Sequence, residues 1–413
     1  MAEPTTVKAH RQGASEMGSR AGVKKLLSSI VGPFATGSLT IDLPSGQRVV
    51  LTGENCGLNA HIALHRWRAL PRIALGGDVG FADALGSGEC SSQDLKVLLL
   101  WGIDNTGASG SVGDPHLASQ LMSRIRHRMR ANTRRNSRRN IAAHYDLGNA
   151  FYAAWLDKDL NYSSGIYDAP GATLEEAQKA KLERVADLLE LQCGESILEI
   201  GCGWGALAHL LIADHRCHVT GLTLSAEQLD YARRRLSVFD GCSDLRLQDY
   251  RDATGTFDRI VSIEMMEAVG EAYWPTYFAK IASCLSQSGN AVLQVITLNE
   301  ARFHDYRRRP DFIQLSIFPG GMLPTKSIIT AQAEQAGLVV ERSEYFGTSY
   351  ARTLADWRVR FDRAWPAIKA LGFDERFRRL WDYYLVYCEA GFEAGWVDVG
   401  LYQLRHANRP GEH

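Results

Sequence analysis

The 413-residue chain lacks the sequence patterns of a disulfide framework, a zinc site or a membrane span. Its eight cysteines form no CxxC pair and no paired spacing with histidine, which argues against a metal site and favours a reducing compartment. The longest apolar runs, such as Val97–Trp101, fall far short of the roughly 20 residues that span a bilayer. Residues 1–21 have no apolar core, so we expect a disordered N-terminus and no secretory signal. These absences predict a cytoplasmic protein that is soluble and binds no metal, and whose membrane contact is peripheral.

Acidic residues are absent between Asp114 and Asp146, although the whole chain has a net charge of only −1. Apolar residues recur there at every fourth position, so we predict a basic helical linker over residues 111–140. Anionic lipid headgroups attract clustered basic residues at roughly 1 kcal/mol each, which would hold the protein at the inner face of a membrane. Nucleic acid is an alternative partner, although no nucleic-acid-binding module is recognisable, and a solvated helix face is a third interpretation. The arginines of this stretch are Arg124, Arg126, Arg128, Arg130, Arg134, Arg135, Arg138 and Arg139.

Residues 22–110, which precede the linker, predict a small α+β domain. Within them, Gly37–Leu43 and Gln47–Leu51 alternate in polarity around Pro44-Ser45-Gly46, which is a hairpin signal. Residues 93–101 have the pattern of an amphipathic helix.

Residues 141–406, which follow the linker, alternate between strand and helix patterns. This alternation predicts a doubly wound, parallel α/β sheet. Thr173 and Glu176 have the spacing of a capping box that opens a helix. Residues 350–406 are rich in aromatic side chains, and we expect them to be helical. The strands expected in the sheet are 196–200, 218–222, 245–248, 257–263 and 290–296, with helices at 206–213, 226–239 and 273–285.

The sequence Ile197-Leu-Glu-Ile-Gly-Cys-Gly-Trp-Gly205 is the most informative motif in the chain. An apolar strand ends in Glu199, and glycines then lead directly into a helix, as in nucleotide-binding α/β proteins. Gly201 and Gly203 let the backbone approach a ligand where a Cβ would collide. The motif lacks the third glycine of the dinucleotide pattern, so it favours S-adenosylmethionine over NAD.

Polar residues also follow the other predicted strands. Thr223 and Gln228 stand where a dinucleotide site would place an acidic residue. Two further strands end in the segments 248–252 and 262–270, which contain Asp249 and Glu267. Because parallel strands share one carboxyl edge, we expect these groups to line a single crevice.

Eight motifs together resemble the cyclopropane-fatty-acid synthase family of S-adenosylmethionine-dependent methyltransferases. This family implies a Rossmann-like class I methyltransferase domain and a small N-terminal α+β domain that contacts lipid, which we match to residues 22–110. The motifs run from about residue 140 to 396: His144-Tyr-Asp-Leu-Gly-Asn149, Asn161-Tyr-Ser-Ser164, Glu199–Gly205, Thr223-Leu-Ser-Ala-Glu-Gln228, Glu267-Ala-Val-Gly270, Ile317-Phe-Pro-Gly-Gly321, Tyr350-Ala-Arg-Thr353 and Trp381-Asp-Tyr-Tyr-Leu-Val-Tyr-Cys388.

The resemblance also implies roles for individual residues. Glu267 and Tyr350 match positions that hold a bicarbonate ion used as a base, and Cys388 matches a cysteine discussed as catalytic. In the same anion pocket, many members have a cysteine where this chain has Ser164 and a histidine where it has Gln294. The catalytic residues implied by the resemblance therefore include these two substitutions. The residues expected to bind the cofactor are Tyr162, Ser163, Glu199, Gly201, Gly203, Thr223, Gln228, Tyr250 and Arg251.

The implied reaction is methyl transfer to the cis double bond of a phospholipid acyl chain, followed by loss of a proton and closure of a cyclopropane ring. A methyl-branched or methylene product without a ring is the alternative. A nucleic-acid methyltransferase and a non-catalytic lipid-binding protein that lost its chemistry through Ser164 and Gln294 are further readings. The expected partners are acyl chains at an anionic membrane surface, with no nucleic acid, and a homodimer is left open.

Overall fold

The computed structural model describes residues 22–105, 136, 147–239 and 241–408, and the predicted basic linker with its arginines therefore lies outside the described residues. The chain divides into two compact units. The smaller contains the residues up to 121 together with Glu375–Tyr383, and the larger contains 122–374 and 384–413. The first part of a C-terminal helix thus groups with the N-terminal residues, a division that the sequence pattern did not indicate.

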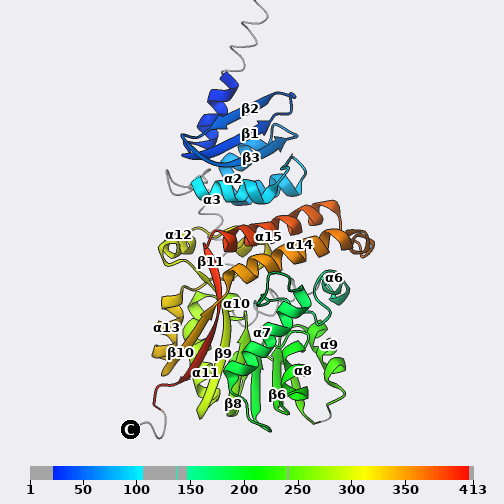
Figure 1. The fold of residues 1–413 in the computed structure, drawn as a ribbon, viewed down its shortest axis with the longest axis vertical. Helices are drawn as coiled ribbons and strands as arrows, with labels where there is room; N and C mark the ends of the chain where they lie inside the picture. The colour runs from blue at the N-terminus through cyan, green and yellow to red at the C-terminus, as the bar shows by residue number, and fades with distance from the viewer. Residues whose placement is uncertain (1–21, 106–135, 137–146, 240, 409–413) are drawn as a thin grey trace, which may run out of the picture. The chain divides into compact units, whose positions relative to one another are not determined.

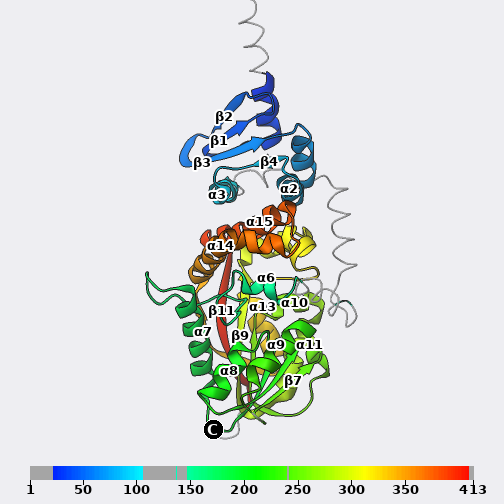
Figure 2. The ribbon, with the colours of Figure 1, turned by 90° about the vertical axis from the view of Figure 1, so that its right-hand side faces the viewer.

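The smaller unit contains a four-stranded sheet in the order β2-β1-β3-β4. The predicted hairpin is confirmed, since β1 pairs antiparallel with β2 around residues 43–47. Helix α2 contains several glycines and is kinked at one of them, Gly77 (φ 57°). The elements are β1 (Thr36–Asp42), β2 (Arg48–Thr52), β3 (Asn55–Leu64), α2 (Ala69–Gly86), β4 (Cys90–Ser91) and α3 (Leu95–Asn105), preceded by helical residues 22–31. Of the named elements, Figure 1 labels all except β4, which Figure 2 labels.

The larger unit contains a seven-stranded sheet in the order β10-β11-β9-β8-β5-β6-β7. The five strands from β9 to β7 run parallel, as the sequence predicted, and β11 lies antiparallel between β9 and β10. The strands are β5 (Ser196–Ile200), β6 (His218–Thr223), β7 (Ser243–Leu247), β8 (Phe257–Ile263), β9 (Leu285–Leu298), β10 (Leu338–Tyr345) and β11 (Val397–His406).

Helices cover both faces of this sheet, and alternate strand residues enter two separate cores. In β5, Ile197 packs with helices α7, α8 and α9, whereas Leu198 packs with α11 and α13 on the other face. Figure 2 shows α7 and α11 on opposite sides of the sheet. This burial of both faces explains why the strands are apolar runs rather than alternating ones. The helices are α6 (Asn149–Ala153), α7 (Leu174–Leu189), α8 (Ala206–Ala213), α9 (Ala226–Leu236), α10 (Met266–Val269), α11 (Trp274–Cys284), α12 (Phe303–Arg308), α13 (Lys326–Gln335), α14 (Gly347–Ala370) and α15 (Glu375–Glu393).

The expectation that residues 350–406 are entirely helical is wrong. Helices α14 and α15 account for the aromatic-rich part, but residues 397–406 form strand β11. Its middle residues are buried on both faces, including Leu401, Tyr402 and Leu404, because the strand is internal to the sheet. Aromatic content alone did not distinguish a buried strand from a buried helix.

The capping box predicted at the start of α7 is confirmed. The Thr173 hydroxyl accepts the backbone N–H of Glu176, and the Glu176 carboxylate accepts the backbone N–H of Thr173 at 2.7 Å. The two bonds give a partner to the N–H groups of Thr173 and Glu176, which no earlier helical turn can bond.

We predict that Thr173→Ala lowers the free energy of unfolding by about 1 kcal/mol, the usual cost of a lost N-cap. Urea denaturation followed by circular dichroism measures it. Thr330→Ala is the matched control, because Thr330 is an exposed threonine inside α13 whose hydroxyl bonds only a helix carbonyl. Equal destabilisation by both substitutions would show that the capping box contributes nothing specific.

Candidate functional site

The turn between β5 and α8 forms an open backbone cradle at the carboxyl edge of the sheet. Gly201, Gly203 and Gly205 all have positive φ, which side chains disfavour. A Cβ at Gly201 would lie 2.6 Å from Met265 Cγ, so this position requires glycine for space as well. The N–H groups of Gly201 and Cys202 both bond the Leu222 carbonyl, which fixes the turn against β6.

Polar groups from the next two strands lie at the same edge. The Thr223 hydroxyl donates to Gln228 Oε1 at 3.0 Å, and both side chains are buried. Tyr250 is buried with no partner found for its hydroxyl, and burial raises its pKa to about 12. Arg251 forms a two-bond ion pair with Asp249, at 2.8 and 2.6 Å. Hydrogen bonds within the protein therefore orient Thr223, Gln228 and Arg251, three of the residues predicted to bind the cofactor.

Glu199, at the end of β5, is a buried carboxylate with an orphan oxygen. It is 3% exposed, and its Oε2 has no hydrogen-bond partner in the described structure. Burial raises the pKa of Glu199 to about 7, and the Lys181 ammonium lowers it in part. A buried oxygen without a partner at the end of the first parallel strand is suited to accept a ligand hydroxyl.

Helix α7 holds the segment that contains Tyr162 and Ser163. Gln178 Nε2 donates to the Ser163 carbonyl at 2.7 Å, and Lys181 Nζ donates to the Ser163 hydroxyl at 2.8 Å. The Tyr162 hydroxyl lies 2.9 Å from that of Tyr384. The sequence motif identified Tyr162 and Ser163, but not the helix residues that hold them.

Glu264, which follows β8, joins the residues predicted to form the anion pocket. Its Oε1 accepts the backbone N–H of Ser164 at 2.9 Å and Gln294 Nε2 at 2.8 Å, and its Oε2 accepts the Tyr350 hydroxyl at 2.7 Å. Three of the predicted catalytic residues, Ser164, Gln294 and Tyr350, thus converge on one carboxylate that the sequence analysis did not single out. The signal available was its place at a strand end, three residues before Glu267.

The backbone of Glu264 is left-handed, with φ 51°. A residue with a side chain is disfavoured there, at a cost of about 1 kcal/mol or more, and glycine is the residue that the conformation favours. The chain nevertheless places a glutamate there, and its N–H bonds the Gln294 carbonyl at 2.8 Å. The strained backbone aims the carboxylate into the pocket.

The Glu267 carboxyl group is bonded to the backbone of β9 and interacts electrostatically with Glu264. Its Oε1 accepts the backbone N–H of Ile296, and its Oε2 has no partner among the described residues. Burial and the neighbouring Glu264 raise the pKa of Glu267 to about 8. Burial also raises the pKa of Glu264, although the Ser164 N–H, Tyr350 and Lys181 lower it. The two carboxyl groups therefore oppose each other's ionisation. Glu264 has more hydrogen-bond donors to its ionised form than Glu267 has.

Aromatic rings enclose this carboxylate site. Tyr162 lies 5.3 Å from Trp357, and Tyr350 lies 4.4 Å from Phe392, measured between ring centroids. Aromatic faces attract positive charge and exclude water. The surroundings suit an apolar substrate on which a positive charge develops.

Cys388 lies on α15, close enough to interact electrostatically with Tyr350 and Tyr384. Burial and Asp311 raise the pKa of its thiol, so it stays protonated at neutral pH. Because the thiolate is the reactive form of cysteine, these surroundings do not favour Cys388 as a nucleophile.

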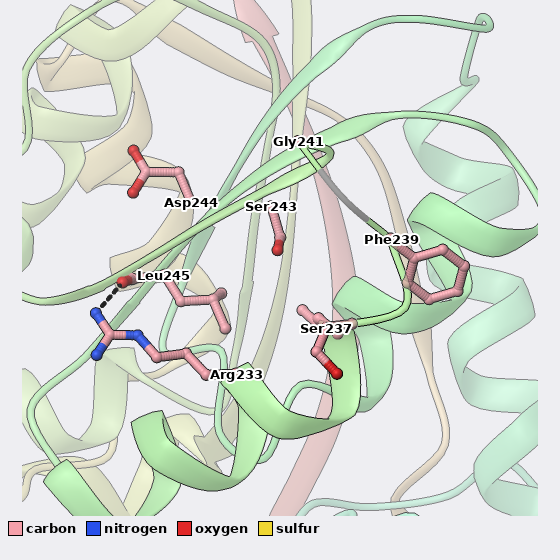
Figure 3. A pocket seen from close by; sticks show the side chains of 8 residues that line it. Arg233, Ser237, Phe239, Gly241, Ser243, Asp244 and Leu245 are labelled. Atoms are coloured by element: carbon pink, nitrogen blue, oxygen red, sulfur yellow. Dashed lines mark hydrogen bonds between the residues drawn. The ribbon is translucent and has the colours of Figure 1, made fainter.

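Among the described residues, a hollow of about 240 Å³ lies between α9 and the start of β7 (Figure 3). It is lined by Arg233, Phe239 and Asp244 among others, and Arg233 Nη2 is bonded to the Leu245 carbonyl at 3.0 Å. This hollow is at the amino end of β7, opposite to the carboxyl edge at which the candidate site lies. No His, Cys, Asp and Glu cluster suited to a metal occurs in the described part of the chain, and no helix there could cross a membrane.

We predict that Gly201→Ala weakens binding of S-adenosylmethionine by about tenfold or more, since a 1.4 kcal/mol loss changes affinity tenfold. The new Cβ would push Met265 and the turn toward the crevice. Gly194→Ala is the matched control, because Gly194 has nearly the same φ (+84° against +87°) and open space around it. Calorimetric titration measures both, and equal affinities would show that the turn does not bind the cofactor.

Comparisons with known proteins agree with this geometry. The family model for mycolic acid cyclopropane synthetase matches residues 132–402. Tuberculostearic acid methyltransferase UfaA1 of Mycobacterium tuberculosis is 37% identical over 84% of this chain and 83% of its own length. Cyclopropane-fatty-acyl-phospholipid synthase of Escherichia coli is 40% identical over 63% of this chain and 65% of its own length.

A solved structure of mycolic acid cyclopropane synthase CmaA1, complexed with SAH and CTAB, superimposes with a TM-score of 0.61 at 29% identity, over 65% of this chain and 97% of that one. The match covers the α/β unit that contains the glycine-rich turn. With the family model spanning most of the chain, the protein belongs to the mycolic acid cyclopropane synthetase family and is an S-adenosylmethionine-dependent methyltransferase.

Proposed function

We propose that this enzyme methylates a double bond in a phospholipid acyl chain and that Glu264 is the base that completes the reaction. The supporting observation is the set of three donors on its carboxylate, from Ser164, Gln294 and Tyr350. Each donor belongs to the pocket that the family resemblance assigned to bicarbonate. A side-chain carboxylate held by these donors can serve in place of that ion.

The residues at the sheet edge fit S-adenosylmethionine. The turn has open space beside Gly203. Glu199 offers an unpaired oxygen to ribose hydroxyls, and Thr223 and Gln228 offer neutral polar groups. Tyr250 and Arg251 would lie at the adenine. When bound, the cofactor supplies a methyl group on positively charged sulfur, and transfer to an alkene leaves a positive charge on the acyl chain.

Side chains of the protein then stabilise that positive charge and accept the proton. Tyr162, Tyr350 and Trp357 present aromatic faces that stabilise a cation and keep water out. Glu264 accepts one proton from the methylated chain, and the C–H electron pair stays on carbon. Gln294 cannot hold a proton at neutral pH, but its amide N–H orients Glu264. Ser164 and Gln294 therefore support the chemistry, which argues against a non-catalytic lipid-binding protein.

Two products are compatible with this proton transfer. If the electron pair closes onto the cationic carbon, a cyclopropane ring forms, and if it forms a double bond, a methylene chain results that a further reduction would turn into a methyl branch. The relative that aligns over both units of this chain is named a methyltransferase, whereas the named cyclopropane synthase aligns over 63% of it. We favour the ring-free product on this support. Mass spectrometry after mild hydrogenation separates the two, since the retained double bond takes up hydrogen.

The acyl chain would be reached at an anionic membrane surface, and the smaller unit presents side chains suited to it. Trp67 is 52% exposed and Leu75 is 48% exposed, near the start of α2. Arg66 and Arg68 flank the tryptophan and are also exposed. An exposed tryptophan between arginines is typical of surfaces that dock at lipid headgroups.

We predict that Glu264→Gln lowers kcat by about 100-fold or more, the usual loss on removing a general base, while cofactor affinity stays near that of the wild type. Glu264→Gly should lose activity in the same way but regain part of it when bicarbonate is added, because glycine suits φ 51° and leaves the donors open. Turnover assays with phospholipid vesicles, in bicarbonate-depleted and supplemented buffer, measure this.

Wild-type enzyme should not respond to bicarbonate. If instead wild-type activity requires bicarbonate and Glu264→Gln keeps it, the ion is the base, as the family resemblance first implied. Glu267→Gln serves as the comparison, since Glu267 was the glutamate expected from the sequence to act in this pocket.

We predict that Trp67→Ala weakens binding to vesicles that contain phosphatidylglycerol severalfold, because the ring no longer inserts at the headgroup level. Co-sedimentation at low and high salt measures it. Leu371→Ala is the control, since Leu371 is similarly exposed (49%) but lies directly after α14 in the larger unit. Equal sedimentation of both variants would place the membrane contact elsewhere.

A further inference from the structure

We propose that Lys181 is a positioning residue that serves the cofactor site and the base together, through the Ser163 hydroxyl and through its charge near Glu264. The second part rests on the proposed function of Glu264. The first part rests only on the contact with Ser163.

Lys181 is an unusual residue to find inside a helix–sheet core. It is 2% exposed on α7, and Ser163 Oγ, at 2.8 Å, is the acceptor found for its ammonium among the described residues. No carboxylate in the described part of the chain lies within ion-pair distance of Nζ. A buried ammonium without an ion-pair partner is costly, so a purely structural position would favour an apolar side chain.

The bond to Ser163 at 2.8 Å places this ammonium beside the next residue, Ser164, whose backbone N–H is bonded to Glu264 Oε1 at 2.9 Å. Three acidic groups from different elements act on the ammonium electrostatically: Glu264 after β8, Asp157 after α6, and Glu199 on β5. Burial lowers the pKa of Lys181 to about 8, so the ammonium is still charged at neutral pH. Its charge in turn lowers the pKa of Glu199 and Glu264, which burial raises. Lys181 therefore favours the ionised form that a base needs.

The contact with Ser163 supplies the link to the cofactor. Lys181 donates to the hydroxyl oxygen, so the hydroxyl hydrogen is directed to another acceptor. Gln178, one helical turn earlier, holds the carbonyl of the same residue. Ser163 is thus fixed on both sides, with its O–H able to donate to the carboxylate of S-adenosylmethionine.

The test compares Lys181→Met with Gln178→Met, two buried substitutions on one helix that each remove one bond to Ser163. Both should weaken binding of S-adenosylmethionine, measured by calorimetry. Only Lys181→Met should move the acid limb of the kcat–pH profile, because only it removes a charge. Without the ammonium the pKa of Glu264 rises, so the limb should shift to higher pH.

Circular dichroism and thermal unfolding establish that each variant is folded. Should Lys181→Met not fold, Ser163→Ala keeps the ammonium and removes its acceptor, and it should weaken cofactor binding by about tenfold while leaving the acid limb in place. A folded Lys181→Met with wild-type affinity and a wild-type acid limb would overturn the proposal, as would wild-type affinity in Ser163→Ala.

These outcomes are separable from those of the proposed function. If Glu264→Gln is fully active, Glu264 is not the base, and the affinity measurements still decide the contact with Ser163. If Glu264→Gln is inactive and the acid limb of Lys181→Met does not move, the base assignment stands and the charge role of Lys181 is wrong.

Discussion

The site depends on the burial of several carboxyl groups at one sheet edge with few cations beside them. Glu199 lies at the end of β5, Glu264 and Glu267 follow the parallel strand β8, and burial raises the pKa of each. Such an arrangement is unfavourable in an empty site, because desolvation opposes each negative charge. A positive charge that develops beside these groups offsets part of that cost, which fits the cation that the proposed reaction forms.

The fold brings these groups together from distant parts of the chain. Parallel strands β5 and β8 present Glu199 and Glu264 at the same edge, β9 adds Gln294, and α14 adds Tyr350. Helix α7 lies beside the sheet and holds Ser163 and its neighbour from the side. No single segment contains the site, and strand order rather than sequence proximity determines its composition.

Sequence patterns predicted the features that depend only on residues close together in the chain. The turn after β5 needs glycines whatever the rest of the chain does, and the capping box of α7 is formed within four residues.

Glu264 was missed because its role comes from contacts with residues 30 to 100 positions away, and the segment 262–270 contains two glutamates that look equivalent in sequence. Lys181 was missed because a lysine in an amphipathic helix is expected on the solvent-exposed face, whereas this one is buried. Strand β11 was missed because its burial on both faces depends on β9 and β10 lying beside it.

The position of β11 also has a consequence for how the chain acquires its structure during synthesis. This strand is the last of the sheet to leave the ribosome, yet it lies between two earlier strands rather than at an edge. Until residues 397–406 are available, β9 and β10 each have an unpaired backbone edge, and the apolar surface that β11 covers is open to solvent. The nascent protein therefore remains exposed to aggregation until its final strand is inserted, and only then does the catalytic unit become a single cooperative structure.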